Sequence, residues 1–534
     1  MSEKLEKYKR GEMPLPEKQL AWLVYGAGFE NVGKDGKPVW CPLREPTENE
    51  ILCRVDAVGL CLSDIKIINQ GSSHPRLRGR DLQKDPTVLG HECCVTVVKA
   101  GARWKDKFSR GDRFIVQADI YFKGLGYAFG YLIPGGLEQY CYLDERVLDG
   151  DEGCYLLPVQ PDTGYSQSAL SEPWACVEMS YNLEIPFVPG RTLVVTNAPP
   201  QWLEKYPEAE VVSEDLARLP EGNFDIIVLC RPKPKVVEQL ANRLNKNGIM
   251  YLLGAPAETG AASLDIGRIH YENIRFLGGG DDPESVHKAN ARHDLLPQGV
   301  ALFIGAGGPM GQMHVQRAIE IPCGARRVVV TDLDPSRLEH IQKRFGGLAR
   351  VKGVDLHLLC PKDFASTQAM NEKIRELAPN GYNDICVLAP VPALVTQAME
   401  WAADNALVNV FAGIPIGNPA PIPIQDICRG IKIIGSSGSR IRDLQKILSM
   451  VEAGHLNTDL SVAAIGGLNS AREGLEAVKS GRFPGKIVIY PQFPELPLMP
   501  LEEIPKRIPQ VAAKLGPDGE WTKKAEEALL ELYL

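Results

Sequence analysis

The feature that most constrains the fold is an alternation of apolar, strand-like runs with helical stretches that begins near residue 190. The runs are RTLVVTN, FDIIVLC, GIMYLLGAP, VALFIGAGG, ARRVVVTDLD, YNDICVLAP and NALVNVFAG. Strands that alternate with helices pair in parallel, because each helix crosses back over the sheet before the next strand begins. The pattern predicts a doubly wound parallel sheet and an α/β fold class.

This region also contains a repeat. Asp225 to Pro256 aligns without gaps on Asp384 to Pro415, at an offset of about 160 residues. Each copy then runs into a similar ending, at residues 274–280 and 431–438. Any two parallel-sheet units share some of this texture, but we favour two tandem nucleotide-binding folds.

The second copy opens with VALFIGAGGPMGQMHVQRA, which predicts a strand, a glycine-rich turn and the start of a helix. Such glycines let the backbone approach a pyrophosphate, which is held by the N–H groups and the positive dipole end of the helix. The turn is one residue longer than G-x-G-x-x-G, so the role of each glycine stays open. The predicted cofactor-binding residues of the turn are Gly305, Gly307, Gly308, Pro309, Met310 and Gly311.

An acid follows at the end of the next strand. RRVVVTDLDPSR places Asp332 there, about 20 residues after the turn. A carboxylate at this place accepts hydrogen bonds from an adenosine ribose and repels a 2′-phosphate. Arg337 is the nearest cation and is expected on a helix surface, although it counts among the candidate cofactor contacts. The sequence therefore predicts NAD, with NADP the less favoured cofactor.

The first copy lacks this turn. It opens with RTLVVTNAPPQWLEKY, which has no glycine and places two prolines where N–H donors are needed. Because proline has no N–H group, we expect residues 186–295 to hold no dinucleotide. They are expected to form a structural or oligomer-forming domain.

Residues up to about 185 consist of short β-branched runs broken by glycine and proline, which predicts a unit of short strands. His91, Glu92, Cys93 and Cys94 stand there in a row. Successive residues of an extended segment point to opposite faces, so the four cannot all bind one ion. Further ligands must come from elsewhere in the chain.

Cys61, in GLCLSDIK, and Glu172, in ALSEPWACVEMSYN, are the candidates. Cys61, His91 and either Glu92 or Glu172 give three protein ligands and a free fourth position, the pattern of a catalytic zinc. Alone, a buried cysteine more often belongs to the core, and a glutamate at a helix start more often caps it. The combination is more specific, since a hydride-transferring enzyme needs a group that polarises the substrate oxygen.

Together these motifs resemble the zinc-dependent medium-chain dehydrogenase/reductase superfamily, in its sorbitol (polyol) and threonine dehydrogenase branch. The motifs are GLCLSD, GHE, GDRF, EPWAC, GAGGPMG with VVVTDLD, and GRFPGKIVIYP. The resemblance leaves out the first copy and about the last forty residues. It implies one catalytic Zn²⁺ per chain on Cys61 and His91, with Glu92 and Glu172 competing for the third place.

The resemblance also implies roles for neighbouring residues. Ser63 hydrogen-bonds the substrate hydroxyl, and Asp64 supports the histidine ligand. Lys66 replaces the family's relay histidine, so the proton ends on an amine or on water. The lobe that binds the family's structural zinc needs four cysteines, and only Cys141 lies in that stretch, so no second zinc is expected.

The implied organisation is a GroES-like, β-rich zinc catalytic domain at 1–185, completed by 441–534. A degenerate Rossmann-like domain at 186–295 and an NAD-binding Rossmann domain at 296–440 stand between them. The tail DGEWTKKAEEALLELYL predicts an amphipathic helix, and a frayed terminus is the alternative.

Composition restricts the setting. The formal net charge of −8 argues against nucleic acid as a partner. The sequence shows neither a signal peptide nor a run of apolar residues that could span a membrane. Thirteen cysteines without a scaffold spacing fit reduced thiols. We therefore expect a cytoplasmic homo-oligomer, a dimer or tetramer, that acts on a small molecule.

The expected reaction is hydride transfer between NAD(H) and a polyol, a sugar alcohol or the corresponding ketose. The loop NQGSSHPRLRGRDLQKDP, between the cysteine and histidine ligands, is cationic. Its Arg76 and Arg80 are candidates to hold a substrate phosphate, as the family's L-sorbose 1-phosphate reductases require. The alternative is a solvated loop whose arginines pair with Asp81 and Asp85. A threonine dehydrogenase-like amino-alcohol oxidoreductase and a zinc-free, non-catalytic binding protein remain open as well.

Overall fold

The computed structural model describes residues 2–182, 190–322 and 324–534, and this part of the chain divides into two compact units. Unit 1 joins Met1–Glu178 to Gly438–Leu534, and unit 2 is Met179–Ser437. Segments far apart in the sequence therefore fold together in unit 1. The expected domain boundary at residue 185 lies outside the described residues.

The described residues of unit 1 form a mixed sheet of eight strands, in the order β11-β7-β6-β4-β26-β25-β27 with β10 beside β4. The two longest strands pair antiparallel and are rich in β-branched residues, which favour a pleated surface. The strands are β4 (Ile51–Gly59), β6 (Glu92–Ala100), β7 (Arg113–Val116), β10 (Tyr140–Leu143), β11 (Leu156–Pro158), β25 (Val462–Gly467), β26 (Lys486–Tyr490) and β27 (Met499–Pro500).

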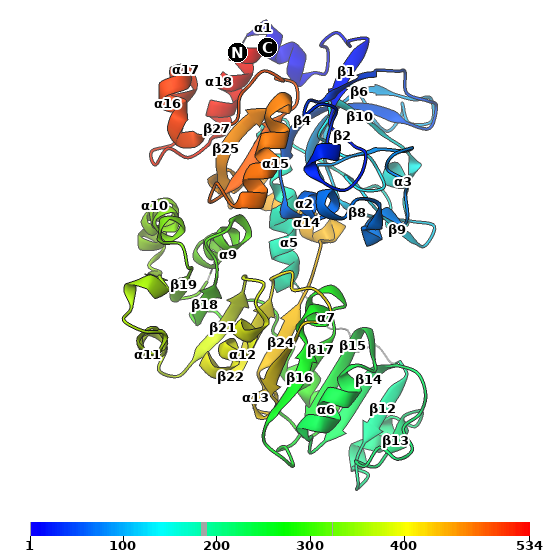
Figure 1. Ribbon diagram of the computed structural model, residues 1–534, viewed down its shortest axis with the longest axis vertical. Coiled ribbons are helices and arrows are strands. Elements are labelled where there is room, and N and C mark those ends of the chain that lie inside the picture. Colours follow the sequence, from blue (N-terminus) through cyan, green and yellow to red (C-terminus); the bar gives the residue numbers. More distant parts are fainter. Residues whose placement is uncertain (1, 183–189, 323) are drawn as a thin grey trace. The chain divides into compact units, whose positions relative to one another are not determined.

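Three short pairs of strands and several helices surround this sheet (Figure 1). The paired strands are β1 (Lys18–Ala21) with β3 (Val39–Pro42), β2 (Leu23–Val24) with β5 (Thr87–Val88), and β8 (Asp119–Phe122) with β9 (Leu125–Ala128). The helices are α1 (Glu3–Lys9), α2 (Leu62–Gln70), α3 (Glu145–Leu148), α4 (Tyr165–Ala169), α5 (Ser171–Tyr181, which ends in unit 2), α14 (Ile441–Glu452), α15 (Ala471–Ser480), α16 (Ile504–Arg507), α17 (Pro509–Ala512) and α18 (Lys523–Tyr533).

The C-terminal tail is an ordered part of unit 1. α18 buries Leu529 and Leu530, and Trp521 just before it is fully buried. The buried carboxylate of Glu526 accepts hydrogen bonds from the backbone N–H groups of Tyr165 and Ser166, at the start of α4. The tail therefore forms the expected amphipathic helix and packs within unit 1, which also contains the N-terminal residues.

Unit 2 contains, among its described residues, one sheet of 11 strands in the order β13-β12-β14-β15-β17-β24-β22-β21-β18-β19-β20 (Figure 1). Neighbours are parallel except at the β17–β24 junction. The strands are β12 (Thr192–Val195), β13 (Glu210–Val212), β14 (Phe224–Cys230), β15 (Leu244–Leu253), β17 (Arg275–Gly278), β18 (Val300–Ile304), β19 (Arg327–Thr331), β20 (Asp355–Leu359), β21 (Tyr382–Val387), β22 (Ala402–Val410) and β24 (Lys432–Gly435).

A separate two-stranded pair, β16 (Ala261–Asp265) and β23 (Pro419–Pro423), also belongs to unit 2. Its helices are α6 (Pro234–Ala241), α7 (Ile266–Tyr271), α8 (Pro283–Ala289), α9 (Pro309–Glu320), α10 (Pro335–Lys352), α11 (Thr367–Leu377), α12 (Pro392–Trp401) and α13 (Ile424–Cys428). The predicted α/β fold class and the two tandem copies with parallel strands are confirmed.

The structure corrects the register of the repeat by one residue. Asn247 and Asn405 occupy the same left-handed position in β15 and β22 and are 158 residues apart. Aligning Asp225 with Asp384 gives 159 instead, so that alignment is wrong by one. The structural equivalent of Asp225 is Asn383, since each accepts a hydrogen bond from a backbone N–H at the start of its copy. Asp225 accepts from Arg191, just before β12, and Asn383 accepts from Val300, the first residue of β18.

The first copy lacks the helix that would follow its opening strand. After β12, the turn through Pro199 and Pro200 leads into a single 3₁₀ segment, Gln201–Lys205. At the same point the second copy starts α9, a helix of 12 residues. The copies thus share the later strands and helices and differ in the part that the sequence predicts to bind a dinucleotide.

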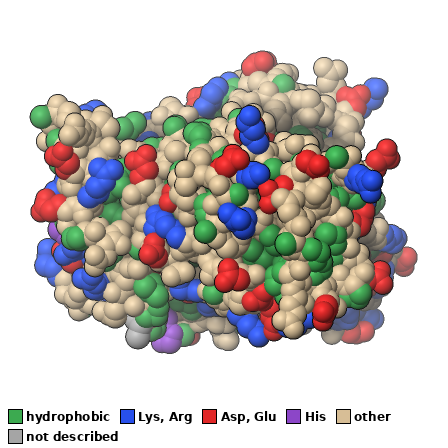
Figure 2. Space-filling view, turned by 90° about the horizontal axis from the view of Figure 1, so that it is seen from below, with side chains coloured by type: hydrophobic (Ala, Val, Ile, Leu, Met, Phe, Trp, Pro, Cys, Tyr) green, Lys and Arg blue, Asp and Glu red, His purple; other side chains and the backbone are tan. Residues whose placement is uncertain are grey.

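In the described part of the chain, no helix is both long and apolar enough to cross a membrane. Acidic and basic side chains are interspersed on the face shown in Figure 2, where no broad area of a single sign stands out.

Candidate metal centre and cofactor site

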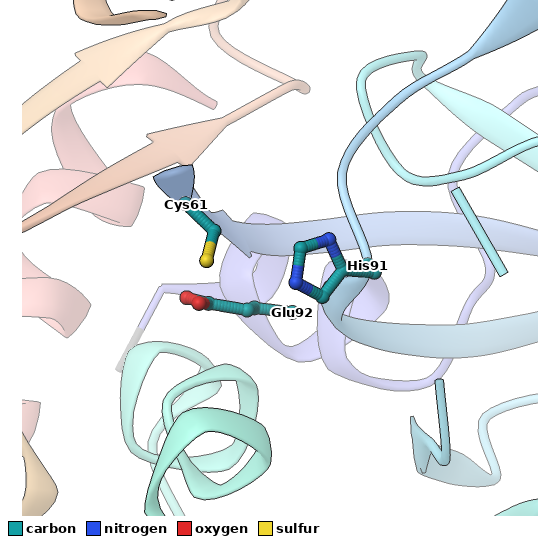
Figure 3. A group of neighbouring side chains, drawn as sticks. All are labelled: Cys61, His91 and Glu92. Atoms are coloured by element: carbon teal, nitrogen blue, oxygen red, sulfur yellow. The ribbon is translucent and has the colours of Figure 1, made fainter. Parts of the chain in front are cut away.

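Cys61, His91 and Glu92 converge in unit 1 (Figure 3). One ligand atom from each lies within 4.8 Å of the others, and they form the only such group of three or more metal-ligating side chains among the described residues. Cys61 is the N-cap residue of α2, His91 directly precedes β6, and Glu92 is the first residue of that strand. His91 and Glu92 are buried, whereas Cys61 is half-buried.

The carboxylate of Asp64 bridges the start of α2 and the segment before β6. Its Oδ2 accepts from the N–H of Cys61 at 3.0 Å, and its Oδ1 accepts from the N–H of Gly90 at 3.2 Å. The same Oδ1 lies 3.4 Å from Nδ1 of His91. Burial lowers the pKa of His91, but the neighbouring Asp64 carboxylate, together with Cys61 and Tyr131, raises it well above the ordinary value. The expected support of the histidine by Asp64 therefore has a geometric basis.

Glu92 is held by a buried ion pair with Lys486 of β26, through its Oε1. Its other oxygen, Oε2, is buried and lacks a hydrogen-bond partner. A Cβ on Gly59 would lie 2.0 Å from that oxygen, so glycine in β4 makes room for the carboxylate. An unsatisfied buried carboxylate oxygen is costly, and a bound cation beside it would remove that cost.

Glu172 lies in the first turn of α5, as expected, but outside the group of three. It is buried, and burial raises its pKa to about 7, with the nearby charges of His91 and Glu92 acting in opposite directions. Its Oε1 accepts a weak hydrogen bond from Sγ of Cys176 at 3.9 Å. The structure thus brings Glu92 closest to Cys61 and His91, and leaves Glu172 beside them.

These donors fit zinc. A thiolate, an imidazole and a carboxylate are the ligand types of catalytic zinc sites, which keep one further position open. The neighbouring strand residues Cys93 and Cys94 are fully buried in β6 and lie outside the group. Of the four consecutive residues, only His91 and Glu92 are therefore placed to hold a metal.

Two other predicted residues lie on α2. Ser63 is half-buried, two residues after Cys61, and Lys66 is exposed one turn further along. Residues three apart on a helix are neighbours on its surface. The helix thus offers a hydroxyl near the metal ligands and an amine toward solvent.

The cationic loop places its two arginines differently. Arg80 donates to the carbonyls of Asp85, Leu132 and Pro86 and pairs with the Asp85 carboxylate at 2.9 Å, so it stabilises the loop itself. Arg76 pairs at 2.7 Å with Asp119, with its side chain 45% exposed. This geometry favours Arg76 over Arg80 as a ligand for a substrate phosphate.

Arg76 is connected to the metal group through one aromatic ring. The Tyr131 ring lies 5.9 Å from the His91 ring, and the Arg76 guanidinium lies 5.4 Å from the centre of the Tyr131 ring. Arg76 and His91 are therefore at most about 11 Å apart, the sum of these two distances. His74 also contacts Tyr131, at 5.7 Å.

The glycine-rich turn of unit 2 is shaped to take a bulky anion. A Cβ on Gly308, the N-cap of α9, would meet no atom within 4 Å, so the space above it is open. A Cβ on Gly311 would lie 2.4 Å from Cα of Ala306, so only glycine lets α9 pack this close to the turn. Gly305 has a positive φ of 71°. Pro309 and Met310 begin the helix between these glycines.

Asp332 follows β19, as predicted. Its carboxylate accepts from the N–H of Gly307 at 2.7 Å and from that of Asp334 at 3.0 Å. It therefore shapes the turn and keeps lone pairs for a ribose, since each oxygen has two. Arg337 lies in α10, 3.7 Å from the Asp334 carboxylate.

Lys486 was not predicted as a residue of the site, although it lies within the motif GRFPGKIVIYP. The signal was a single cation at the start of an apolar strand, KIVIY. A lysine in such a strand is buried only with a counter-charge. That rule predicts a carboxylate partner but cannot name Glu92, which lies about four hundred residues earlier.

Comparison with known proteins gives three kinds of similarity. The alcohol dehydrogenase GroES-like domain matches residues 47–149. The L-sorbose 1-phosphate reductase of Klebsiella pneumoniae is 25% identical over 495 residues, which cover 90% of this chain and 92% of that protein. The mannitol-1-phosphate 5-dehydrogenase of Aliivibrio fischeri is 23% identical over 507 residues, covering 91% of this chain and 92% of that protein.

Among solved structures, the 2R,3R-butanediol dehydrogenase from Bacillus subtilis aligns with a TM-score of 0.55 at 15% identity. The alignment covers 89% of this chain and 99% of that one. At this identity the similarity is one of fold.

Proposed function

The chain belongs to the zinc-dependent medium-chain dehydrogenase/reductase superfamily, in its polyol branch, and is a polyol oxidoreductase; we propose that it transfers a hydride between NAD(H) and a phosphorylated polyol or the corresponding ketose. The observation that carries this proposal is the convergence of Cys61, His91 and Glu92 in the GroES-like unit. The open glycine-rich turn of unit 2 supports the binding of a dinucleotide cofactor.

Cys61, His91 and a carboxylate, Glu92 or Glu172, would hold one zinc ion, and Gly305–Gly311 with Asp332 would hold NAD. When bound, the zinc would polarise the substrate oxygen and lower the pKa of the hydroxyl, and NAD would accept the hydride from the adjacent carbon. Ser63 hydrogen-bonds the substrate hydroxyl and passes its proton outward. Lys66, one turn along α2, or water then takes the proton.

The phosphate belongs to the proposal for two reasons. Two relatives that align over about nine-tenths of the chain are named for a phosphorylated sugar or sugar alcohol. The exposed guanidinium of Arg76 lies one aromatic ring from His91, a separation that a substrate of sugar size can span. Arginine suits a phosphate because its planar fork donates two hydrogen bonds at once.

The direct test is a substrate panel with the purified protein and NAD, followed through NADH formation. The panel contains hexitol phosphates, the same hexitols without phosphate, and threonine as an amino alcohol. The proposal expects turnover of a hexitol phosphate and a zinc content of one ion per chain. Turnover of threonine alone would favour the amino-alcohol alternative. A zinc-free protein without turnover would favour a binding role.

Cofactor choice gives a first prediction. The Asp332 carboxylate repels a 2′-phosphate, so kcat/KM is expected to be at least tenfold higher with NAD than with NADP. Initial rates with both cofactors measure this ratio, and a preference of tenfold or more for NADP would contradict the assignment.

The phosphate site gives a second prediction. Arg76→Ala should raise the KM for a phosphorylated polyol by about tenfold or more, the loss of one charged hydrogen bond worth about 1.4 kcal/mol. The KM for the same polyol without phosphate should hardly change. Arg78→Ala is the matched control, since Arg78 lies in the same loop but contacts the Tyr127 ring, at 5.7 Å. Equal, small effects of Arg76→Ala on both substrates would contradict a phosphate contact and leave Arg76 only its surface ion pair with Asp119.

A further inference from the structure

The contacts between the two copies in unit 2 are reciprocal: each copy uses the same elements to contact the other. β16 and β23 are equivalent strands and pair antiparallel, with Ser263 opposite Pro421. At the repeat offset of 158, these two residues are equivalents of one another. At the sheet junction, Phe276 of β17 pairs with Ile433 of β24. These two are also equivalents, at an offset of 157, because they pair with Met250 and Val408, which are equivalent at the offset of 158. Both junctions are therefore centred on a pseudo-two-fold axis.

The side-chain pairs on the two sides of the axis are equivalent as well. Ala262 pairs with Ile422, and the equivalent residues, Ala420 and Leu264, pair in the same way, small against large. All four are buried within one hydrophobic core that includes residues of both copies. A shared apolar core is typical of obligate interfaces.

Backbone packing is reciprocal as well. Gly278 ends β17, and a Cβ there would lie 2.2 Å from the carbonyl oxygen of Ile427 in α13. Gly435 ends β24, and a Cβ there would lie 3.0 Å from the carbonyl oxygen of Ile269 in α7. Each copy thus ends its last strand with a glycine that admits the equivalent helix of the other copy.

Mutual, self-complementary contacts of this kind define the isologous interface of a two-fold dimer. Here both halves belong to one chain. The first copy has lost the glycine-rich turn and its helix, yet it has kept every element of the junction: β16, α7 and β17. We propose that residues 190–295 are a built-in partner, which occupies in the same molecule the place that a second nucleotide-binding domain would take in a dimer.

This proposal assigns a role to a domain that we expect to bind no cofactor. The edge strands β23 and β24 of the working copy are paired within the chain, so they are closed to a second molecule. Any self-association of the protein must use another surface. The first copy covers the apolar face beside this edge, which would otherwise be open to aggregation.

A disulfide across β16 and β23 tests the proposal in the full-length protein. Pro419, Pro421 and Pro423 alternate along β23 and have no N–H, so Ser263 and Pro421 form a non-hydrogen-bonded pair. Cα atoms of such pairs are about 4.5 Å apart, which a disulfide can bridge. Both positions are exposed. The double variant Ser263→Cys/Pro421→Cys is oxidised at several protein concentrations and run on a non-reducing gel.

The expected product is a cross-linked species with the mass of one chain, formed to the same extent at every concentration. Mass spectrometry should find the two introduced thiols joined in one peptide pair. The single variants Ser263→Cys and Pro421→Cys control for reaction with native cysteines and should give no such pair. A product with the mass of two chains that dominates at low concentration would overturn the proposal, because the copies would then pair between molecules. Absence of the cross-link would overturn it too, because the pairing itself would be missing.

Discussion

Replacing Cys61 by serine is expected to lower dehydrogenase activity by about a thousandfold or more and to abolish zinc binding. The expected size follows from the several kcal/mol of transition-state stabilisation that a metal supplies as a Lewis acid. A serine hydroxyl is a far weaker zinc ligand than a thiolate, and the remaining His91 and carboxylate cannot complete the site. Activity, zinc content and melting temperature are measured on the same preparation.

The fold should survive this change, because a catalytic site with an open position contributes little to the stability of unit 1. Cys41→Ser is the matched control, a half-buried cysteine of the same unit outside the metal group. It should retain zinc and activity. A Cys61→Ser protein that keeps both would remove Cys61 from the site. Two zinc ions per wild-type chain would contradict the expectation of a single, catalytic ion.

Replacing Lys486 by methionine is expected to lower the free energy of unfolding of unit 1 by about 3–5 kcal/mol, the usual cost of leaving a buried charge without its partner. Lys486 and Glu92 are 3% and 0% exposed, so solvent cannot replace the lost ammonium group. For a unit of this size the melting temperature should fall by roughly 6 to 20 °C. Calorimetry on the metal-free protein measures this without interference from zinc.

Lys99→Met controls for the loss of a lysine, because its ion pair with Glu45 lies at the surface, with the two side chains 46% and 72% exposed. Exposed pairs contribute about 0–1 kcal/mol, so this variant should melt close to the wild type. The double variant Lys486→Met/Glu92→Gln should recover most of the lost stability, since no unpaired charge remains. A single Lys486 variant as stable as Lys99→Met would show that Glu92 does not depend on its lysine.

Much of the fold could be predicted because its signals are local. The alternation of apolar runs with helical stretches predicted the parallel strands of unit 2. The prolines after β12 predicted a turn without N–H donors, but the missing first helix of copy one is known only from the structure. The charged and apolar periodicity of the tail predicted α18. The one-residue error in the repeat had a local cause too, since Asp225 and Asp384 match in type but hold different positions in their strands.

The candidate site could be predicted only in part. Cys61, His91 and Glu92 were nominated by their types and by their neighbouring glycines, and the structure brings the three together. The choice between Glu92 and Glu172 could not be made from the sequence, because it depends on which carboxylate the sheet carries toward the other two. Arg76 and Arg80 looked alike in the loop, yet one pairs with Asp119 and the other holds backbone carbonyls.

The sequence by itself determined which residues can do chemistry: a thiol, an imidazole and carboxylates for a metal, glycines and an acid for a dinucleotide. These properties belong to single residues and short segments, so they can be read without knowing what lies opposite. The tertiary structure alone decided the partners. It paired Lys486 with Glu92, and Ser263 with Pro421. Burial and the pairing of strands depend on segments hundreds of residues apart, whose meeting is fixed by the packing of the whole unit and not by any pattern within either segment.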